Sequence, residues 1–378
     1  MKTIQKAYKF RLYPNQDQQI LIAKTLGSCR YVFNHFLNEW NITYKTTSKG
    51  LSYSKCSKEL PSLKSELTWL REIDSTALQT TLKHLDTSFK NFFRKQNQYP
   101  KFKSKKNPVQ SYTSKFTNNN IRIDGKRMKL PKLGYVRFKP SRELGGRIIS
   151  ATVKKSATGK YYVSLLVEES KPTAFKKTHA SIGIDYGLKD LMVLSDGETV
   201  PNIKSYRALE NKLKKAQRSL SRKHKGSSNY YKDKLKIAKI HEKIANVREF
   251  HLHKVTTALV KNHDFIAIED LCVKDMLQDS NLSKSISDVS LAKCTEMLTY
   301  KANWYGKTLV KVDKYFPSSQ LCSSCGHQNP ELKDYHIRKW DCPICHVHHD
   351  RDFNASVNIL KEGLRIALQR TVGATGVA

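Results

Sequence analysis

The sequence has few acidic residues for its size. It contains 33 Asp and Glu against 68 Lys and Arg, which gives a formal net charge of +35. A surface of this charge disfavours cationic partners and favours a polyanion such as nucleic acid. Because the basic residues occur along the whole chain and not in one tail, they predict a long nucleic-acid channel.

Long apolar runs and disulfide-type cysteine spacing are also missing. No segment approaches the roughly 18 apolar residues of a membrane span, and residues 1–7 lack the apolar core of a secretory signal. Four of the eight cysteines lie in paired motifs, and the other four are scattered: Cys29, Cys56, Cys272 and Cys294. This usage is typical of a cytoplasmic protein whose cysteines bind metal, with no membrane partner.

The paired cysteines predict a structural zinc site. Cys322-x-x-Cys325 and Cys342-x-x-Cys345 are separated by sixteen residues, the spacing of a Cys₄ zinc ribbon. Four thiolates complete a tetrahedral shell and leave no open position for catalysis. Nearby histidines could replace a cysteine, although four cysteines already suffice: His327, His346, His348 and His349.

The first half of the chain combines strands with an inserted helical segment. Residues 2–12 alternate as a strand does, helical patterns follow from 16 to about 44 and from about 75 to 93, and 112–170 is rich in short strands. We expect a small antiparallel barrel that the opening strand joins. The aromatic residues near 89–93 are spaced as a core face, whereas the basic and aromatic segment 94–106 suits contact with a nucleic-acid backbone.

The second half is predicted to adopt an RNase H-like fold. Two strands at 181–187 and 191–195 are followed by a helical hairpin with arms at about 205–224 and 229–261. A strand at 264–269, a helix at about 289–305, a strand at 307–312 and a helix from about 352 complete the order. The polar outer faces of the hairpin are strongly basic, which fits either solvent or nucleic acid. Such folds host nucleases, transposases and integrases, so the order alone does not fix the function.

Three acidic residues fall where this fold would place a metal site. Asp185 and Glu269 end strands, and Asp352 opens the last helix. Each has small residues on its own face, and we interpret these as leaving room for a metal or phosphate. They are Gly183 for Asp185, Ala267 for Glu269, and Ala355 and Ser356 for Asp352. The same pattern favours Glu269 over Asp270.

The chemistry explains why three acids would be gathered. In-line hydrolysis of a phosphodiester needs positive charge at both the attacking and the leaving oxygen, and two Mg²⁺ ions about 3.5–4 Å apart provide it. Mg²⁺ takes carboxylate oxygens and keeps several waters. Taken singly, Asp352 and Asp350 could each be a helix N-cap and Asp185 a turn acid. Three acids at compatible positions of one fold favour the catalytic interpretation.

Several motifs resemble the TnpB family of transposon-encoded RNA-guided nucleases, which are related to type V CRISPR effectors. The matching stretches span nearly the whole chain: Y-K-F-R-L-Y-P at 8–14, F-F-R at 92–94, Y-P-K-F-K-S-K at 99–105, I-G-I-D-Y-G at 182–187, I-A-I-E-D-L at 266–271, Tyr300-Lys301-Ala302 with Gly306, P-S-S-Q-L-C-S-S-C-G at 317–326 and D-R-D-F-N-A-S-V-N-I at 350–359.

The resemblance implies a multidomain α/β protein. A wedge-like β-barrel would comprise 1–12 and 96–172, with a helical recognition lobe inserted at 13–95. A RuvC-type nuclease domain would comprise 173–320 and 350–378, interrupted by the zinc ribbon at 321–349. Asp185, Glu269 and Asp352 would be its catalytic triad and would hold the Mg²⁺ ions.

The implied function is RNA-guided cleavage of DNA in a prokaryotic cytoplasm, in association with the nucleoid. A noncoding guide RNA would pair with target double-stranded DNA beside a short motif that the protein reads. Two alternatives remain open. One is a non-cleaving RNA-guided repressor, although all three triad positions are acidic here; the other is a transposase or its accessory protein.

Overall fold

The computed structural model describes residues 3–107, 109–279, 282–334 and 336–375. The chain divides into two compact units between Ser170 and Lys171. Each unit has its own hydrophobic core. Within the described residues, no helix combines the length and the apolar character needed to cross a membrane.

The first unit is built on a seven-stranded antiparallel sheet in the order β2-β6-β7-β1-β5-β4-β3. Strands β2 and β3 are the two edges of the sheet and do not pair with each other in the described residues. The sheet is therefore a half-barrel and not a closed barrel. Strand β1 joins it between β7 and β5, as the sequence predicted. The strands are β1 (Thr3–Tyr13), β2 (Gln110–Lys115), β3 (Arg122–Asp124), β4 (Arg127–Leu130), β5 (Gly134–Lys139), β6 (Arg147–Lys155) and β7 (Tyr161–Ser170).

Helices inserted between β1 and β2 pack on this sheet through a shared core. They are α1 (Gln16–Thr47), α2 (Tyr53–Glu66), the 3₁₀ helix η1 (Thr68–Glu72) and α3 (Ser75–Phe93). Helix α1 begins with a capping box, in which the Asn15 side chain accepts from the Gln18 N–H at 2.8 Å and Gln18 accepts from the Asn15 N–H at 3.1 Å. The predicted aromatic core face is correct for Phe89, which is buried against Trp40, but Phe93 is 63% exposed.

The second unit contains a five-stranded mixed sheet in the order β10-β9-β8-β11-β12. Strands β8, β11 and β12 are parallel, and β9 and β10 are antiparallel to their neighbours. The bounds are β8 (Ser181–Tyr186), β9 (Asp190–Leu194), β10 (Thr199–Pro201), β11 (Phe265–Glu269) and β12 (Thr308–Val312).

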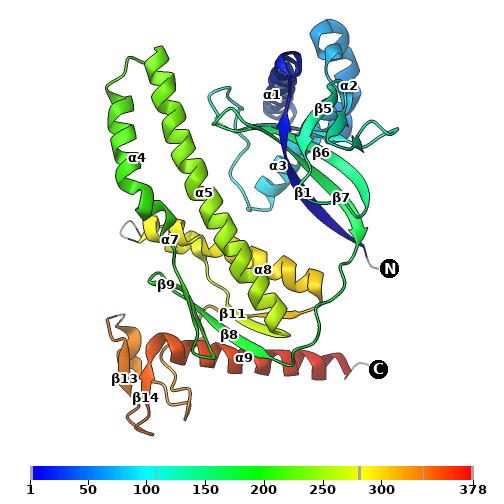
Figure 1. The fold of residues 1–378 in the computed structure, drawn as a ribbon. Helices are drawn as coiled ribbons and strands as arrows, with labels where there is room; N and C mark the ends of the chain where they lie inside the picture. Colours follow the sequence, from blue (N-terminus) through cyan, green and yellow to red (C-terminus); the bar gives the residue numbers. More distant parts are fainter. Residues whose placement is uncertain (1–2, 108, 280–281, 335, 376–378) are drawn as a thin grey trace. The chain divides into compact units, whose positions relative to one another are not determined.

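Helices cover both faces of this sheet (Figure 1). Ile182, Ile184, Ile266 and Ile268 face the core formed with helices α5 (Ser228–Asn262) and α8 (Leu291–Tyr305). Ala267 and Val312 face the opposite side and pack against Ile359 of helix α9 (Arg351–Thr375). The alternation of side chains along each strand therefore assigns the acid-bearing face to α9.

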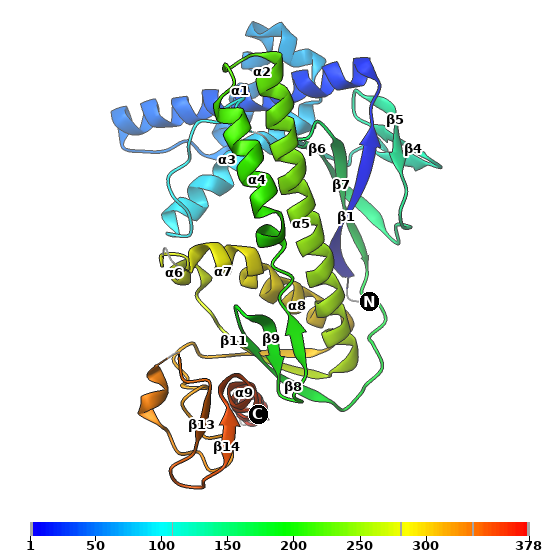
Figure 2. The ribbon, with the colours of Figure 1, turned by 60° about the vertical axis from the view of Figure 1, so that its left-hand side comes forward.

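A helical hairpin extends from the sheet (Figure 2). Its arms are α4 (Ser205–Ser221) and the long α5, close to the predicted ranges, and Leu213, Ile240 and Ile244 form a small core between them. The short helices α6 (Val273–Met276) and α7 (Ser283–Val289) were not predicted from the sequence, and neither was α2.

Candidate active site and cysteine cluster

Two of the three acids lie side by side on adjacent parallel strands. The register pairs Ile184 of β8 with Ile268 of β11, so Asp185 and Glu269 are the next residue in each strand. Both side chains are partly buried. The neighbouring Asp270 instead forms an ion pair with Lys311 at 2.8 Å on the exposed surface. The side chain of Asp270 is therefore engaged elsewhere, which supports Glu269 as the acid that accompanies Asp185.

Helix α9 brings Asp352 to the same place. The pKa of Asp185 is raised by burial first and then by the charges of Glu269 and Asp352, so the three carboxylates share one electrostatic environment. Asp350 caps the helix, because its side chain accepts from the N–H groups of Asp352 and Phe353 at 3.2 and 3.1 Å. Asp352 itself is one residue inside the helix, and its side chain is therefore free of the capping role.

The small residues near the acids serve helix packing and not metal access. A Cβ on Gly183 would lie 2.1 Å from the carbonyl oxygen of Ser356 on α9. A Cβ on Gly363 would lie 2.5 Å from the Cβ of Ala267, and Ala355 and Ser356 are fully buried. The interpretation that these residues clear space for a metal was therefore wrong. They let the backbone of α9 approach the sheet closely enough to carry Asp352.

Burial raises the pKa of Asp185 well above its usual range and also raises the pKa of Glu269. Desolvation penalises the charged carboxylate, and the neighbouring acids add repulsion at Asp185. The Ser318 hydroxyl donates to Glu269 Oε1 at 2.6 Å and partly offsets the effect on Glu269. A bound cation would lower the cost of ionising these carboxyl groups.

Two arginines partly offset the negative charge. Arg338 Nη1 donates to both carboxylate oxygens of Asp352, at 3.1 and 3.2 Å. Arg351 is buried, donates from Nη1 to the Asp334 carbonyl at 2.6 Å, and lowers the pKa of Asp185 through its charge. No role of Arg338, Arg351 or Ser318 was predicted from the sequence. Ser318 lies within a quoted motif, but the contact of Arg338 with Asp352 spans fourteen residues that no short pattern connects.

The donor set fits hard divalent cations. The charges of Glu269 and Asp352 both act on Asp185, and Mg²⁺ prefers carboxylate oxygens together with water. Burial is the largest cause of the raised pKa of Asp185, the charges of Glu269 and Asp352 raise it further, and the two arginines offset only part of the rise. A divalent ion would supply further positive charge.

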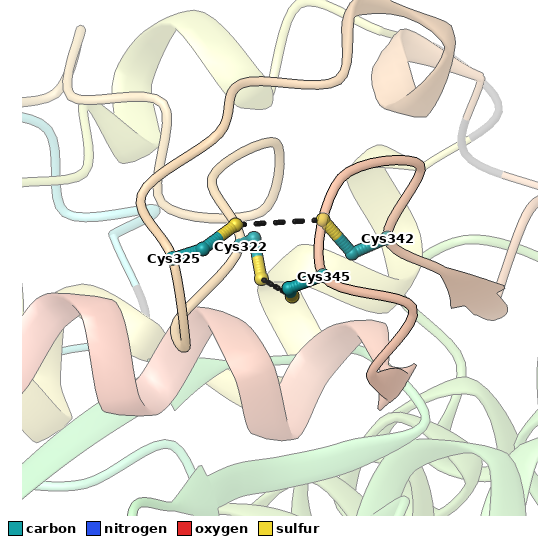
Figure 3. A group of neighbouring side chains, drawn as sticks. All are labelled: Cys322, Cys325, Cys342 and Cys345. Carbon is teal, nitrogen blue, oxygen red and sulfur yellow. Dashed lines mark hydrogen bonds between the residues drawn. The ribbon is translucent and has the colours of Figure 1, made fainter.

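The four predicted cysteines form one cluster (Figure 3). The Sγ atoms of Cys322 and Cys345 are 3.6 Å apart, as are those of Cys325 and Cys342, and all four lie within 4.8 Å of one another. A tetrahedral zinc with bonds of about 2.3 Å has sulfur–sulfur edges of about 3.8 Å. The cluster therefore has the chemistry and the dimensions of a Cys₄ zinc site.

Each cysteine pair sits in the same kind of turn. The N–H of Gly326 donates to Cys322 O, and the N–H of His346 donates to Cys342 O, both at 2.9 Å. Gly326 and His346 both have positive φ, of 78° and 59°. His346 thus occupies the same place in the second turn that Gly326 occupies in the first. Burial opposes ionisation of Cys342, but hydrogen bonds from the backbone of Cys345 and Ile344 lower its pKa to about 6.

His349 lies beside the cluster without joining it. Its Nε2 is 3.0 Å from Cys322 Sγ, and its ring packs on Trp340 at a centroid distance of 4.8 Å. Strands β13 (Lys339–Asp341) and β14 (His348–Asp350) pair antiparallel in this region, which also contains the short η2 (Pro330–Lys333). A histidine at this place supports a thiolate ligand from outside the metal shell.

The ribbon is fastened to the acid-bearing helix. Strand β14 runs directly into α9, and Asn354 accepts from the Ser323 N–H at 2.8 Å and donates to Leu321 O at 2.7 Å. Asn358 donates to the carbonyls of Ser318 and Leu321 at 2.8 and 2.7 Å. The first cysteine pair and the start of α9 are therefore one connected structure.

The hairpin presents a basic surface. Many of its charged side chains are exposed on α4 and in the connecting turn: Lys212, Lys214, Lys215, Arg218, Arg222, Lys223 and Lys225. Lys214 pairs with Glu210 at 3.1 Å. This concentration of like charge fits contact with a nucleic-acid backbone.

Three families match parts of the chain. Residues 164–279 match a family described as "Probable transposase", and residues 292–359 match "Cas12f1-like, TNB domain". Residues 1–49 match a family described as "Helix-turn-helix domain", but the described part of this segment forms strand β1 and the single helix α1.

Two bacterial relatives match nearly the whole chain, and a viral relative matches just over half of it. A "Putative RNA-guided DNA endonuclease" of Streptomyces pristinaespiralis is 38% identical over 369 residues, which are 96% of this chain and 90% of that one. The "Putative RNA-guided DNA endonuclease InsQ" of Escherichia coli K12 is 35% identical over 96% of this chain and 93% of its own length. "TnpB-like protein L79" of Acanthamoeba polyphaga mimivirus is 29% identical over 57% and 44%.

A solved structure shares the fold. The protein in "Cryo-EM structure of the Cas12f1-sgRNA-target DNA complex" aligns with a TM-score of 0.59 over 94% of this chain and 98% of that one, at 13% identity. The predicted fold class, a multidomain α/β protein with a barrel-type sheet and a four-cysteine ribbon, is confirmed by this likeness and by the cysteine cluster.

Proposed function

The chain belongs to the TnpB family of RNA-guided DNA endonucleases, and from this premise we propose that it cleaves DNA under the direction of a guide RNA. Its partners would be a noncoding RNA and a double-stranded DNA that the RNA matches. Pairing would supply the sequence information, and the basic protein surface would supply affinity for both backbones. Because its target is DNA, we expect it to act in the prokaryotic cytoplasm at the nucleoid.

The catalytic centre in this proposal is the acid cluster. Asp185, Glu269 and Asp352 would hold Mg²⁺, which supplies charge compensation at the attacking and leaving oxygens of the phosphodiester when bound. Ser318 orients Glu269, and Arg338 holds the Asp352 carboxylate. The assignment is supported by one observation: the charges of Glu269 and Asp352 both raise the pKa of Asp185.

The domain boundaries follow from the same proposal. Residues 1–12 and 96–172 would form the wedge-like barrel and 13–95 the recognition lobe. Residues 173–320 and 350–378 would form the RuvC-type nuclease domain. Residues 321–349 would form the ribbon, where Cys322, Cys325, Cys342 and Cys345 would bind a structural zinc ion.

Substitution of the acids tests the catalytic assignment. Asp185→Ala and Glu269→Ala should each slow cleavage of a matched plasmid by at least about 10³-fold, because several kcal/mol of charge stabilisation would be lost. Binding of guide RNA and target should persist. Asp270→Ala is the matched control, since Asp270 faces Lys311, and it should cut normally. Continued cutting by the Asp185 and Glu269 variants would refute the assignment.

The same assay separates the alternatives. A non-cleaving repressor would bind the matched plasmid and leave it intact at every Mg²⁺ concentration. A transposase would join cut transposon ends to a second DNA, and we expect no joined product. Sequencing the RNA that co-purifies with the protein would identify the guide.

A further inference from the structure

A pocket on the helical part of the first unit has the composition of a nucleotide-binding site. It has a volume of about 430 Å³, within the usual range of about 300–1,000 Å³ for small-molecule sites. One face of α1 and a single residue of η1 line it: Gly27, Arg30, Tyr31, Asn34, His35 and Trp69. It lies outside the acid and cysteine clusters, and nothing described above uses it.

Two aromatic walls define the pocket. The rings of Tyr31 and Trp69 are 5.3 Å apart at 76°, and each side chain is about two-fifths exposed, at 40% and 41%. The His35 ring stacks on Tyr31 at 6.0 Å and 14°. Exposed aromatic side chains that meet at a corner leave ring surface available for a planar ligand. Every nucleobase can stack on an exposed aromatic ring, because each base is itself a flat aromatic ring.

The charge around the pocket is positive and partly uncompensated. The Arg30 guanidinium has no hydrogen bond or ion pair within the part of the chain that the structure describes. Asn34 clamps the backbone of Lys103 from both sides, with hydrogen bonds of 2.9 and 2.7 Å, and so fixes the basic segment 101–106 beside the pocket. The nearby Glu72 is paired with Lys24 at 2.8 Å. A ligand with a negatively charged phosphate fits this positively charged pocket.

The floor of the pocket is a glycine that packing does not require. Gly27 lies inside α1, where glycine disfavours the helix relative to alanine. A Cβ at this position would meet only Arg30 Nη2, at the ordinary contact distance of 3.8 Å. Gly183 and Gly363 differ, because a Cβ there would clash with α9 or the sheet. The missing side chain at Gly27 therefore keeps space open above the helix.

We propose that this pocket binds an unpaired nucleotide, with its base stacked on Trp69 and Tyr31 and its phosphate held by Arg30. The proposal rests on the proposed function, since guide RNA and opened target DNA are the sources of unpaired nucleotides. The base could come from either strand type, and RNA and DNA probes distinguish the two sources.

Tryptophan fluorescence locates the contact in the full chain. Of the four tryptophans, Trp40 and Trp340 are buried and Trp304 is half-buried, which leaves Trp69 as the exposed reporter. Titration with single-stranded oligouridylate or oligothymidylate should quench the emission. Trp69→Phe should remove most of the quenching, whereas the matched control Trp304→Phe should retain it. Equal quenching in the wild-type protein and in Trp69→Phe would overturn the proposal.

A second variant tests the pocket itself. Gly27→Leu fills the space and places a better helix former in α1, so the protein should fold, as circular dichroism can verify. Binding of a labelled oligonucleotide should weaken roughly five-fold or more, the equivalent of losing one stacked base. Arg30→Gln should weaken binding and reduce its salt dependence. Unchanged affinity in both variants would overturn the proposal.

The outcomes separate this proposal from the proposed function. Stronger binding of oligouridylate assigns the nucleotide to the guide RNA, and stronger binding of oligothymidylate assigns it to DNA. A wild-type protein that cuts a matched plasmid but shows no Trp69-dependent quenching contradicts the pocket alone. A protein that binds neither guide RNA nor any oligonucleotide contradicts the proposed function as well.

Discussion

At the scale of single residues, Asp185 is held in a position that disfavours its charge. The pKa of its carboxyl is raised by burial and by Glu269 and Asp352, so the folded protein keeps this proton to a higher pH than the unfolded chain does. For such a group, the contribution to stability is largest below the unfolded pKa of about 3.9 and is lost as the pH rises through the folded pKa. At neutral pH, which lies above the unfolded pKa, Asp185 therefore destabilises the metal-free fold.

Asp185→Asn should accordingly raise the melting temperature of the metal-free protein at pH 7 while abolishing cleavage. The amide has nearly the same shape but no charge to desolvate. Thermal unfolding in the presence of EDTA measures the effect. The gain over wild type should shrink as the pH is lowered and should vanish below about 3.9, where Asp185 is protonated in both states. A lower melting temperature at pH 7 would contradict the electrostatic account.

The sequence indicated the candidate acids of the site, but it did not indicate the contacts that surround them. Strand ends and a helix start indicated Asp185, Glu269 and Asp352 because period and position are local signals. The contacts of Arg338 with Asp352 and of Ser318 with Glu269 depend on how distant segments fold together. The same limit explains the wrong interpretation of Gly183, whose neighbour on α9 is more than 170 residues away in sequence.

At the scale of elements, the distance between α9 and the sheet depends on paired small residues. Gly363→Ala would place a Cβ 2.5 Å from that of Ala267 and should destabilise the protein by about 1–3 kcal/mol. Because the helix would have to move, cleavage should fall as well. Ala267→Gly in the same chain should recover much of both losses. Urea unfolding and plasmid cleavage of the two single variants and the double variant measure this, and additive losses in the double variant would contradict the contact.

The cysteine ribbon should contain about one zinc per chain. Its removal by a chelator, or Cys342→Ser, should unfold β13 and β14 and release the Asp350 cap from the start of α9, since β14 continues into that helix. We expect cleavage to fall at least about ten-fold and guide RNA binding to change little. Cys272→Ser, at an exposed cysteine outside the cluster, is the control. Zinc content and cleavage rate are the measurements.

The long helices with a periodic apolar pattern were predicted from the sequence, and the short helices were not. The hairpin arms and α8 begin and end within a few residues of their predicted ranges because their apolar stripes are long. Helix α2 was not predicted, although Cys56, Leu60 and Leu63 are buried at helical spacing, because Pro61 and many polar residues obscure the pattern. Helices α6 and α7 are too short for their pattern to be distinguished from a polar loop.

At the scale of the whole molecule, the charge of +35 should make nucleic-acid binding depend steeply on salt. A protein that contacts six to ten phosphates loses about 10³–10⁵ in affinity between 50 and 200 mM salt. Replacing Lys212, Lys215 and Arg222 on the hairpin by Gln should lower the slope of log affinity against log salt by up to about 3.

Replacing Lys212 and Lys215 by Arg keeps the charge and should leave that slope unchanged. Filter binding of guide RNA over a range of salt concentrations provides both values. An unchanged slope in the Gln variant would show that the hairpin does not contact the backbone.

The fold of the whole chain is shared with a protein that has few of the same residues. The solved structure that aligns over 94% of this chain shares only 13% of its residues. Strand order and helix placement can persist at such identity because they depend on patterns of burial and small residues more than on particular side chains. That is why the fold class was predictable from the pattern.

The raised pKa of Asp185 also has an evolutionary consequence. An Asp codon becomes an Asn codon by a single base change, and here that change would silence cutting while making the metal-free protein easier to fold. Nothing in folding opposes the mutation, so only selection for cutting preserves the aspartate. Lineages in which cutting brings no benefit should drift toward chains that still bind their guide and target but leave the DNA whole.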